Sequence, residues 1–291
     1  MARKFTRRRW RRPERLTLEH PPVQRRKDIG APTQLELEPA LARRSSRRRL
    51  ESLLVLFLVL CALEGAAIAA ATGRWLILPA VTGLGVLYFF FGREWGDAWL
   101  RRAMRARGGS SSRLQRLTSA EARSAGIPAP EVLICRGDEP NAIALALRKR
   151  SIVLTEGCEG IDELVLEGML AHEVIHLRDG DAAVASLYLL LAGAPELLFR
   201  RAGVGCLLAV PLWPAALLMR LGRRVALPGD REHRADIAAA MLTRYPPGIV
   251  DALEAAGGPS CGVGLADGFW FVARNDGDGP AEERAGLVAE M

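Results

Sequence analysis

The feature that most restricts the fold is a pair of long apolar runs near the N-terminus. Residues 53–71 hold a single charged residue, Glu64, and residues 75–91 hold none. As helices these runs approach the length needed to cross the hydrocarbon core of a bilayer, about 30 Å. A helix is favoured because lipid leaves backbone polar groups no partners outside their own segment. The short connection at residues 72–74 therefore predicts a transmembrane helical hairpin at residues 51–92, with Glu64 facing the bundle interior.

The charge of the chain is concentrated before this hairpin. Residues 1–50 hold 16 of the 40 Lys and Arg against 5 acids, whereas the remaining residues hold 24 against 28. This composition predicts a disordered basic tail at residues 1–50 that is attracted to anionic lipid. We expect the lipid bilayer as a partner and no nucleic acid, because the tail ends directly at the membrane segment. Basic residues flank both outer ends of the hairpin, so the tail and the following domain are predicted to be cytoplasmic.

The rest of the chain predicts a mainly helical domain with a small sheet. A juxtamembrane helix and a Gly-Ser linker are expected at 93–112, a soluble domain at 113–257 and a C-terminal segment at 258–291. Predicted helices cover residues 114–125 and 161–178, with short strands at 131–135, 141–147 and 151–155. A further helix begins after Asp230, which is a favourable N-cap residue.

A second pair of apolar runs, at residues 182–199 and 202–219, interrupts this domain. Each is at the short end for a membrane-spanning helix, and prolines and Glu196 lie within them. A second membrane hairpin is the favoured interpretation of this insertion at 182–220. The alternative is a hydrophobic hairpin that lies on the membrane or packs on the protein.

The five cysteines show no zinc-knuckle or redox spacing. Cys61 and Cys206 lie inside apolar runs and are expected to act as small hydrophobic residues. Nothing in the cysteine pattern calls for an oxidising compartment.

A short polar motif stands out within the predicted helix at 161–178. Residues 171–176 read Ala-His-Glu-Val-Ile-His, which places His172 and His176 one turn apart on the same helical face. Both imidazoles can then reach one metal ion, and Glu173 can hold a water beside it. The alternative is a pair of helical histidines without a metal.

A catalytic zinc ion takes three protein ligands and leaves a position open. Glu232 is the favoured third ligand, and Asp236 one turn later can accept a hydrogen bond from a ligating histidine. The apolar insertion explains the 56 residues between His176 and Glu232, because two runs out and back return the chain to the surface it left. From spacing alone, Glu232 could equally be an exposed acid among its charged neighbours Asp230, Arg231 and Arg234.

Four motifs in order give the chain a resemblance to a known family. They are Glu139 to Ala142, Ser151 to Gly157, Ala171 to His176 with Gly180-Asp181, and Glu232 to Asp236. Together they resemble the membrane zinc peptidases typified by the heat-shock protease HtpX and the Ste-type prenyl-protein proteases.

The resemblance implies one Zn²⁺ per chain, bound by His172, His176 and Glu232, with Glu173 as the general base and Asp236 behind a ligand. It further implies that Asn141 and Ala142 lie on an edge strand that pairs with the substrate backbone. The implied fold is an α+β zincin-like catalytic domain, mainly α with a small β-sheet, on membrane-spanning helical hairpins.

The resemblance also sets the expected activity. We expect a multi-pass protein of the cell (inner) membrane that hydrolyses extended polypeptide substrates, such as misfolded or membrane proteins. One departure is notable: these enzymes commonly carry a His-Pro step before a C-terminal arginine, and residues 277–284 here contain no histidine. A catalytically weak relative that binds or senses membrane partners is the alternative. A sensor-type peptidase that cleaves a repressor would favour an extracellular ligand domain, which these residues do not show.

Overall fold

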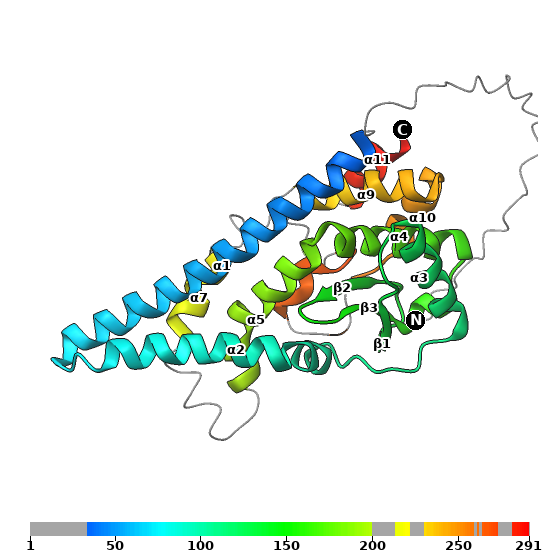
Figure 1. Cartoon of the computed structure of the whole chain (residues 1–291). Helices are drawn as coiled ribbons and strands as arrows, with labels where there is room; N and C mark the ends of the chain where they lie inside the picture. Colours follow the sequence, from blue (N-terminus) through cyan, green and yellow to red (C-terminus); the bar gives the residue numbers. More distant parts are fainter. Residues whose placement is uncertain are drawn as a thin grey trace, which may run out of the picture.

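The computed structural model describes residues 34–199, 213–221, 230–258, 261, 264–272 and 281–290. Two long antiparallel helices, α1 and α2, form an extended arm, and a compact helical body with a small sheet lies against one end of it (Figure 1). This mainly α architecture with a small β-sheet is the fold that the sequence predicts.

The arm consists of α1, Gln34–Thr72, and α2, Ile77–Ala103. Both are long and apolar enough to cross a membrane by length and composition. They approach closely where glycine replaces a side chain: a Cβ on Gly85 would lie 2.9 Å from Cys61 Sγ. Because α1 begins at Gln34, residues 34–50 are helical, contrary to the predicted disordered tail, whose residues 1–33 lie outside the described part. The predicted juxtamembrane helix is the continuation of α2.

The sheet contains β1 (Glu131–Cys135), β2 (Ala142–Ala146) and β3 (Arg150–Thr155). Its strand order is β1-β3-β2, with β1 parallel and β2 antiparallel to β3. Alternate residues face two separate cores. Ile143, Leu145 and Val153 join the core shared with α1, α2 and α5, whereas Ala144 and Ile152 face a second core shared with α3 and α4.

Helix α4, Glu163–Asp179, is the centre of the body. It packs against α3 (Ser112–Ser124), α9 (Arg231–Thr243), α10 (Pro246–Ala255) and the inner face of β2. The Asp162 side chain caps its first turn by accepting a hydrogen bond from Leu164 N at 2.9 Å. Gly180 ends it in a left-handed conformation with φ of 86°, which glycine adopts without strain. The remaining short elements are η1 (Glu156–Glu159), η3 (Gly264–Phe269) and α11 (Ala281–Ala289).

The N-terminal part of α1 docks where α4 ends and α5 begins. Buried Ser46 donates a hydrogen bond to Asp181 Oδ1 at 2.8 Å, and Arg43 Nε donates to the carbonyl of Arg178 at 2.8 Å. A Cβ on Gly180 would lie 3.3 Å from Ser46 Cβ, so the contact is close. The arm and the body are therefore joined by polar contacts as well as apolar packing.

The structure describes the apolar insertion at residues 182–220 on both sides of residues 200–212. Helix α5, Asp181–Phe199, packs against α1, α2 and α7, and α7 spans Trp213–Leu221. Glu64 of α1 is hydrogen-bonded to the backbone of Ala215 on α7, so it faces neighbouring helices as predicted. Residues 200–212 lie outside the described part, and the second membrane hairpin stays a prediction.

The outer edge of β1 is covered by residues 107–110, which were predicted as the end of the juxtamembrane helix and the start of the Gly-Ser linker. Arg107 and Ile134 exchange backbone hydrogen bonds, both of 2.8 Å, and Ser110 Oγ donates to the carbonyl of Val132 at 3.4 Å. On the same strand, Cys135 forms a disulfide with Cys261, a pairing that the cysteine spacing does not indicate. Cys61 is buried as expected, and Cys206 lies outside the described residues.

Candidate metal centre

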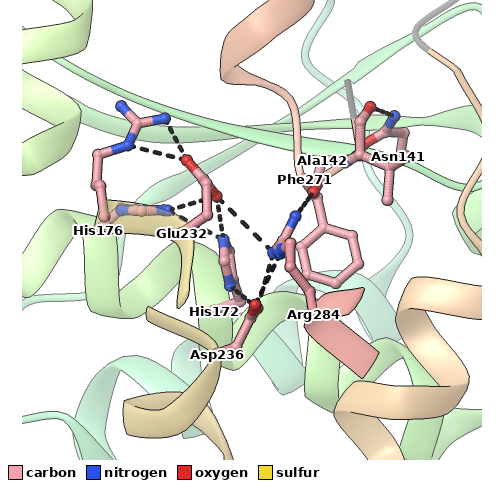
Figure 2. Close-up of polar contacts among 10 residues, drawn as sticks. Asn141, Ala142, His172, His176, Glu232, Asp236, Phe271 and Arg284 are labelled. Atoms are coloured by element: carbon pink, nitrogen blue, oxygen red, sulfur yellow. Dashed lines mark hydrogen bonds and ion pairs between the residues drawn. The ribbon is translucent and has the colours of Figure 1, made fainter. Parts of the chain in front are cut away.

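Three predicted ligands converge at the contact between α4 and α9. His172 and His176 lie on one face of α4, and Glu232 lies in the first turn of α9 (Figure 2). All three are buried, with exposed fractions of 0%, 6% and 5% respectively. Burial excludes the alternative in which Glu232 is an exposed acid on a charged helix surface.

The separations among the three ligand atoms fit a tetrahedral zinc site. His172 Nε2 lies 3.0 Å from His176 Nε2 and 3.1 Å from Glu232 Oε2, and the remaining pair is 3.4 Å apart. Ligands about 2.0 Å from one zinc ion at tetrahedral angles are separated by about 3.3 Å. One ion can therefore contact all three atoms with small adjustments.

The protonation pattern also requires a cation at this point. His172 Nδ1 lies 2.8 Å from Asp236 Oδ1, so its proton belongs on Nδ1 and its Nε2 presents a lone pair. That lone pair faces the carboxylate oxygen of Glu232, and two acceptors at 3.1 Å repel each other unless a positive charge lies between them. Either a proton or a metal ion supplies that charge.

The pKa shifts of His172 and Glu232 also indicate a positive charge at this point. Burial opposes a charge on His172, but Asp236 and Glu232 outweigh it and raise its pKa to about 9. Burial also opposes ionisation of Glu232, yet Arg231 and the two histidines hold the pKa of that carboxyl well below its usual range. The pocket thus stabilises a cation beside an ionised carboxylate, and a metal ion that binds there displaces a proton.

A chain of charged contacts supports His172 from behind. Asp236, which is fully buried, accepts hydrogen bonds from Arg284 Nε at 2.7 Å and Nη2 at 2.8 Å. Arg284 also donates to the carbonyl of Phe271, whose ring meets the His172 ring edge to face at 4.8 Å (Figure 2). Helix α11 is therefore tied to the centre by an arginine from outside the four sequence motifs. The structure brings Asp236 to the predicted position beside His172 Nδ1, whereas the sequence gave no signal for Phe271.

Glu173 lies beside the ligands without joining them. Its side chain is 1% exposed, its carboxylate accepts a hydrogen bond from the backbone of Ala144, and its Oε1 has no partner among the described residues. Burial raises the pKa of this carboxyl, and the neighbouring histidines oppose that rise. A buried carboxylate with one unused oxygen is suited to accept a proton.

Asn141 and Ala142 lie at the start of edge strand β2, as the resemblance implies, but both are fully buried. The Asn141 amide donates to the carbonyls of Gly257 and Val272, and Phe271 N donates to the carbonyl of Ala142 at 2.8 Å. The segment around Phe271 thus occupies the edge at these two residues. Direct pairing of Asn141 and Ala142 with a substrate is at odds with these contacts. Further along the strand, Ala146 N donates to Ser186 Oγ at 2.9 Å.

Comparison with known proteins gives the same assignment over the same residues. The sequence description of peptidase family M48 matches residues 110–254, which include α3 to α10 and all three converging side chains. No solved structure matches the chain.

Several relatives bear the name Protease HtpX homolog. One from Dictyoglomus thermophilum is 33% identical over 154 residues, covering 45% of this chain and 49% of its own length. Those from Limosilactobacillus reuteri and Salinibacter ruber are both 29% identical, covering 72% and 71% of this chain and 80% and 78% of their own lengths. The chain thus spans about half the length of the first relative and most of the other two. With its ordered motifs and the geometry of the centre, the chain belongs to peptidase family M48, with HtpX-type proteins as its relatives.

Proposed function

We propose that this protein is an integral membrane zinc-dependent endopeptidase that cleaves extended segments of misfolded or membrane proteins. The observation that carries the proposal is the convergence of His172 Nε2, His176 Nε2 and Glu232 Oε2, all within 4.8 Å of one another and all buried. Glu173 lies directly beside them, with an oxygen free to act as a base. Family membership and the two long apolar helices support the same function.

In this function His172, His176 and Glu232 would hold the zinc ion. Bound zinc supplies a Lewis acid that polarises the scissile carbonyl and makes water acidic near neutral pH. Glu173 accepts the proton of the attacking water and transfers it to the nitrogen of the leaving amine. Asp236 keeps the proton of His172 on Nδ1, so that Nε2 remains a ligand. Arg284 in turn holds Asp236 in place through two hydrogen bonds.

Edge strand β2 is the proposed substrate platform. An extended peptide can add to such an edge through main-chain hydrogen bonds, a mode that tolerates many sequences. Phe271 covers the edge at Ala142, and the N–H groups of Ala144 and Ala146 already donate to Glu173 and to Ser186 Oγ. We therefore place the substrate on the remaining edge groups of residues 144–146, next to Glu173. The backbone of Ala144 then lies between the proposed base and the bound chain.

The proposed location is the cell inner membrane, with several membrane passes and the catalytic domain in the cytoplasm. The basic flanks of the first hairpin support this orientation. The disulfide between Cys135 and Cys261 bears on it as well, because a reducing cytoplasm would keep both as thiols. We therefore expect the pair to be reduced in cells and to close on oxidation.

A second candidate is a catalytically weak relative that binds membrane partners. The sequence holds only four histidines, His20, His172, His176 and His233, so the C-terminal histidine common in similar enzymes is absent. The segment where it would lie, residues 273–280, is outside the described part.

Zinc analysis combined with a protease assay tests the proposal and separates the two candidates. We expect one zinc per purified full-length chain and cleavage of casein that a chelator abolishes. Glu232→Ala should lose the zinc, whereas Glu254→Ala, an exposed acid on α10, should keep it. A chain that holds zinc without cleaving casein would favour the weak relative, and full zinc in Glu232→Ala would require another third ligand.

A further inference from the structure

The two oxygens of Glu232 have different partners. Oε2 faces His172 Nε2 at 3.1 Å and His176 Nε2 at 3.4 Å, with Arg284 Nη2 farther away at 3.8 Å (Figure 2). Oε1 instead accepts hydrogen bonds from both Nε, at 2.9 Å, and Nη2 of Arg231. The carboxylate is therefore divided between the metal-binding point and a guanidinium group.

Arg231 does not reach Glu232 through ordinary helix geometry. Neighbouring residues on a helix point in different directions, so an i, i+1 contact needs support from elsewhere. Here Arg231 is 4% exposed, and its guanidinium lies over the Phe269 ring at 5.3 Å from the centroid. This stacking is a cation–π arrangement that fixes the plane of the guanidinium. A side chain held on both sides in this way can orient the carboxylate.

A buried positive charge beside a zinc ligand needs a compensating benefit. The guanidinium repels a divalent cation at this short range, so for zinc affinity alone Arg231 is unfavourable. Its fork, however, occupies Oε1 and leaves only Oε2 for the ion. A carboxylate free on both oxygens can bind a metal through both, which takes up a position that a catalytic site keeps open for water or substrate.

We propose that Arg231 is a positioning residue that restricts Glu232 to one-oxygen coordination and so keeps the fourth metal position available. The proposal rests on the metal centre proposed above and gives a role to Arg231, which in the sequence is only one of several charged neighbours of Glu232. If the proposal is right, removal of Arg231 should impair turnover but leave metal binding as tight as before or tighter.

Cobalt(II) bound in place of zinc gives the required readout, because its visible absorption distinguishes four-coordinate from five-coordinate sites. We compare the full-length wild type with Arg231→Met, which keeps side-chain length and packing over Phe269 but removes the donors. The expected result is a weaker, five-coordinate cobalt spectrum, a zinc Kd no higher than that of the wild type, and kcat reduced about 10–100-fold. KM should change little, since the contacts described for Arg231 are with Glu232 and Phe269 and not with β2.

Two further variants make the test specific. Arg234→Met is the matched control, because Arg234 lies on the same helix, half-exposed, and pairs with Asp230 at 3.3 Å. It should keep the wild-type spectrum and rate. Arg231→Lys retains a charged donor for Oε1 and should keep a four-coordinate spectrum.

Each other outcome overturns the proposal. Arg231→Met with an unchanged spectrum, or with zinc binding weakened more than tenfold, would give Arg231 a merely structural role. A five-coordinate spectrum in Arg231→Lys would remove the hydrogen bond as the cause. A wild type that binds no cobalt would instead refute the metal centre itself, so failure of the two proposals can be told apart.

Discussion

The clearest quantitative prediction concerns Glu173→Gln. The two side chains have nearly the same shape, and the site is tightly enclosed, with Glu173 only 1% exposed. The glutamine oxygen can keep the hydrogen bond from the backbone of Ala144, and its NH₂ group takes the place of Oε1, which has no partner among the described residues. We therefore expect the fold and the zinc content to be retained.

Turnover should fall steeply because an amide cannot accept the proton of the attacking water. Loss of a positioned general base typically costs about 10²–10⁴ in rate, or about 3–5 kcal/mol in the activation barrier. Substrate binding should persist, because edge strand β2 is unchanged, so the variant is expected to accumulate a complex with an unfolded protein. That complex offers a route to identify natural substrates.

The assay measures zinc content, thermal unfolding and casein turnover on the same preparations of full-length protein. Glu163→Gln is the matched control: it lies on the same helix, its side chain is 52% exposed, and it should behave as the wild type. Equal zinc with turnover within tenfold of the wild type would remove Glu173 from the mechanism. Loss of zinc in Glu173→Gln would make Glu173 a ligand and undermine the assignment of Glu232.

Three further predictions test packing, electrostatics and topology. In Gly168→Ala the new Cβ would lie 2.6 Å from the carbonyl carbon of Gly248, so the free energy of unfolding should fall by about 1–3 kcal/mol in a thermal unfolding experiment. The control Gly286→Ala, whose Cβ meets nothing within 4 Å, should be neutral or stabilising. Equal effects of the two changes would mean that α4 and α10 separate easily. Burial, together with the charge of Glu167, raises the pKa of Glu121 to about 7 in the folded protein, above its value in the unfolded chain. The contribution of Glu121 to stability is therefore lost as the pH rises through about 7. Glu121→Gln should thus stabilise the protein above pH 7 by about 1 kcal/mol after screening by solvent, with no gain at pH 5, and melting curves at pH 5 and 8 decide it. An engineered Ser112→Cys should resist an impermeant thiol reagent in intact cells and react after permeabilisation; labelling from outside would reverse the proposed orientation.

The parts of this fold that the sequence predicted well are those governed by local periodicity. Strand β1 matches its predicted range at both ends, and α4 differs by only one or two residues, because burial patterns and a capping aspartate are local signals. His172 and His176 share a face for the same reason. Glu232 could be placed by resemblance but not by spacing, since burial of an acid among basic neighbours depends on tertiary contacts.

The misses have a common physical cause in long-range packing. Residues 34–50 have a composition typical of disorder, yet Ser46 and Arg43 find partners at the end of α4, which stabilises a helix that the local sequence does not favour. The linker around Ser110 likewise pairs with β1 instead of remaining free. Asp230 occupies the predicted N-cap position of α9, but it pairs with Arg234 and makes no capping hydrogen bond. None of these contacts can be recognised from the local sequence pattern.

The continuous path of α1 has a consequence for how substrates would be selected. Seven residues separate Ser46, which touches the end of α4, from Leu53, where the apolar run begins, and a helix rises about 1.5 Å per residue. With the hairpin inserted in a bilayer, helix α1 would hold the end of α4 at a fixed distance of about 10 Å from the hydrocarbon. Cleavage would then take place at a set height above the lipid. A membrane-anchored substrate is measured by the length of chain between its anchor and the scissile bond, and bonds too close to the lipid stay out of reach.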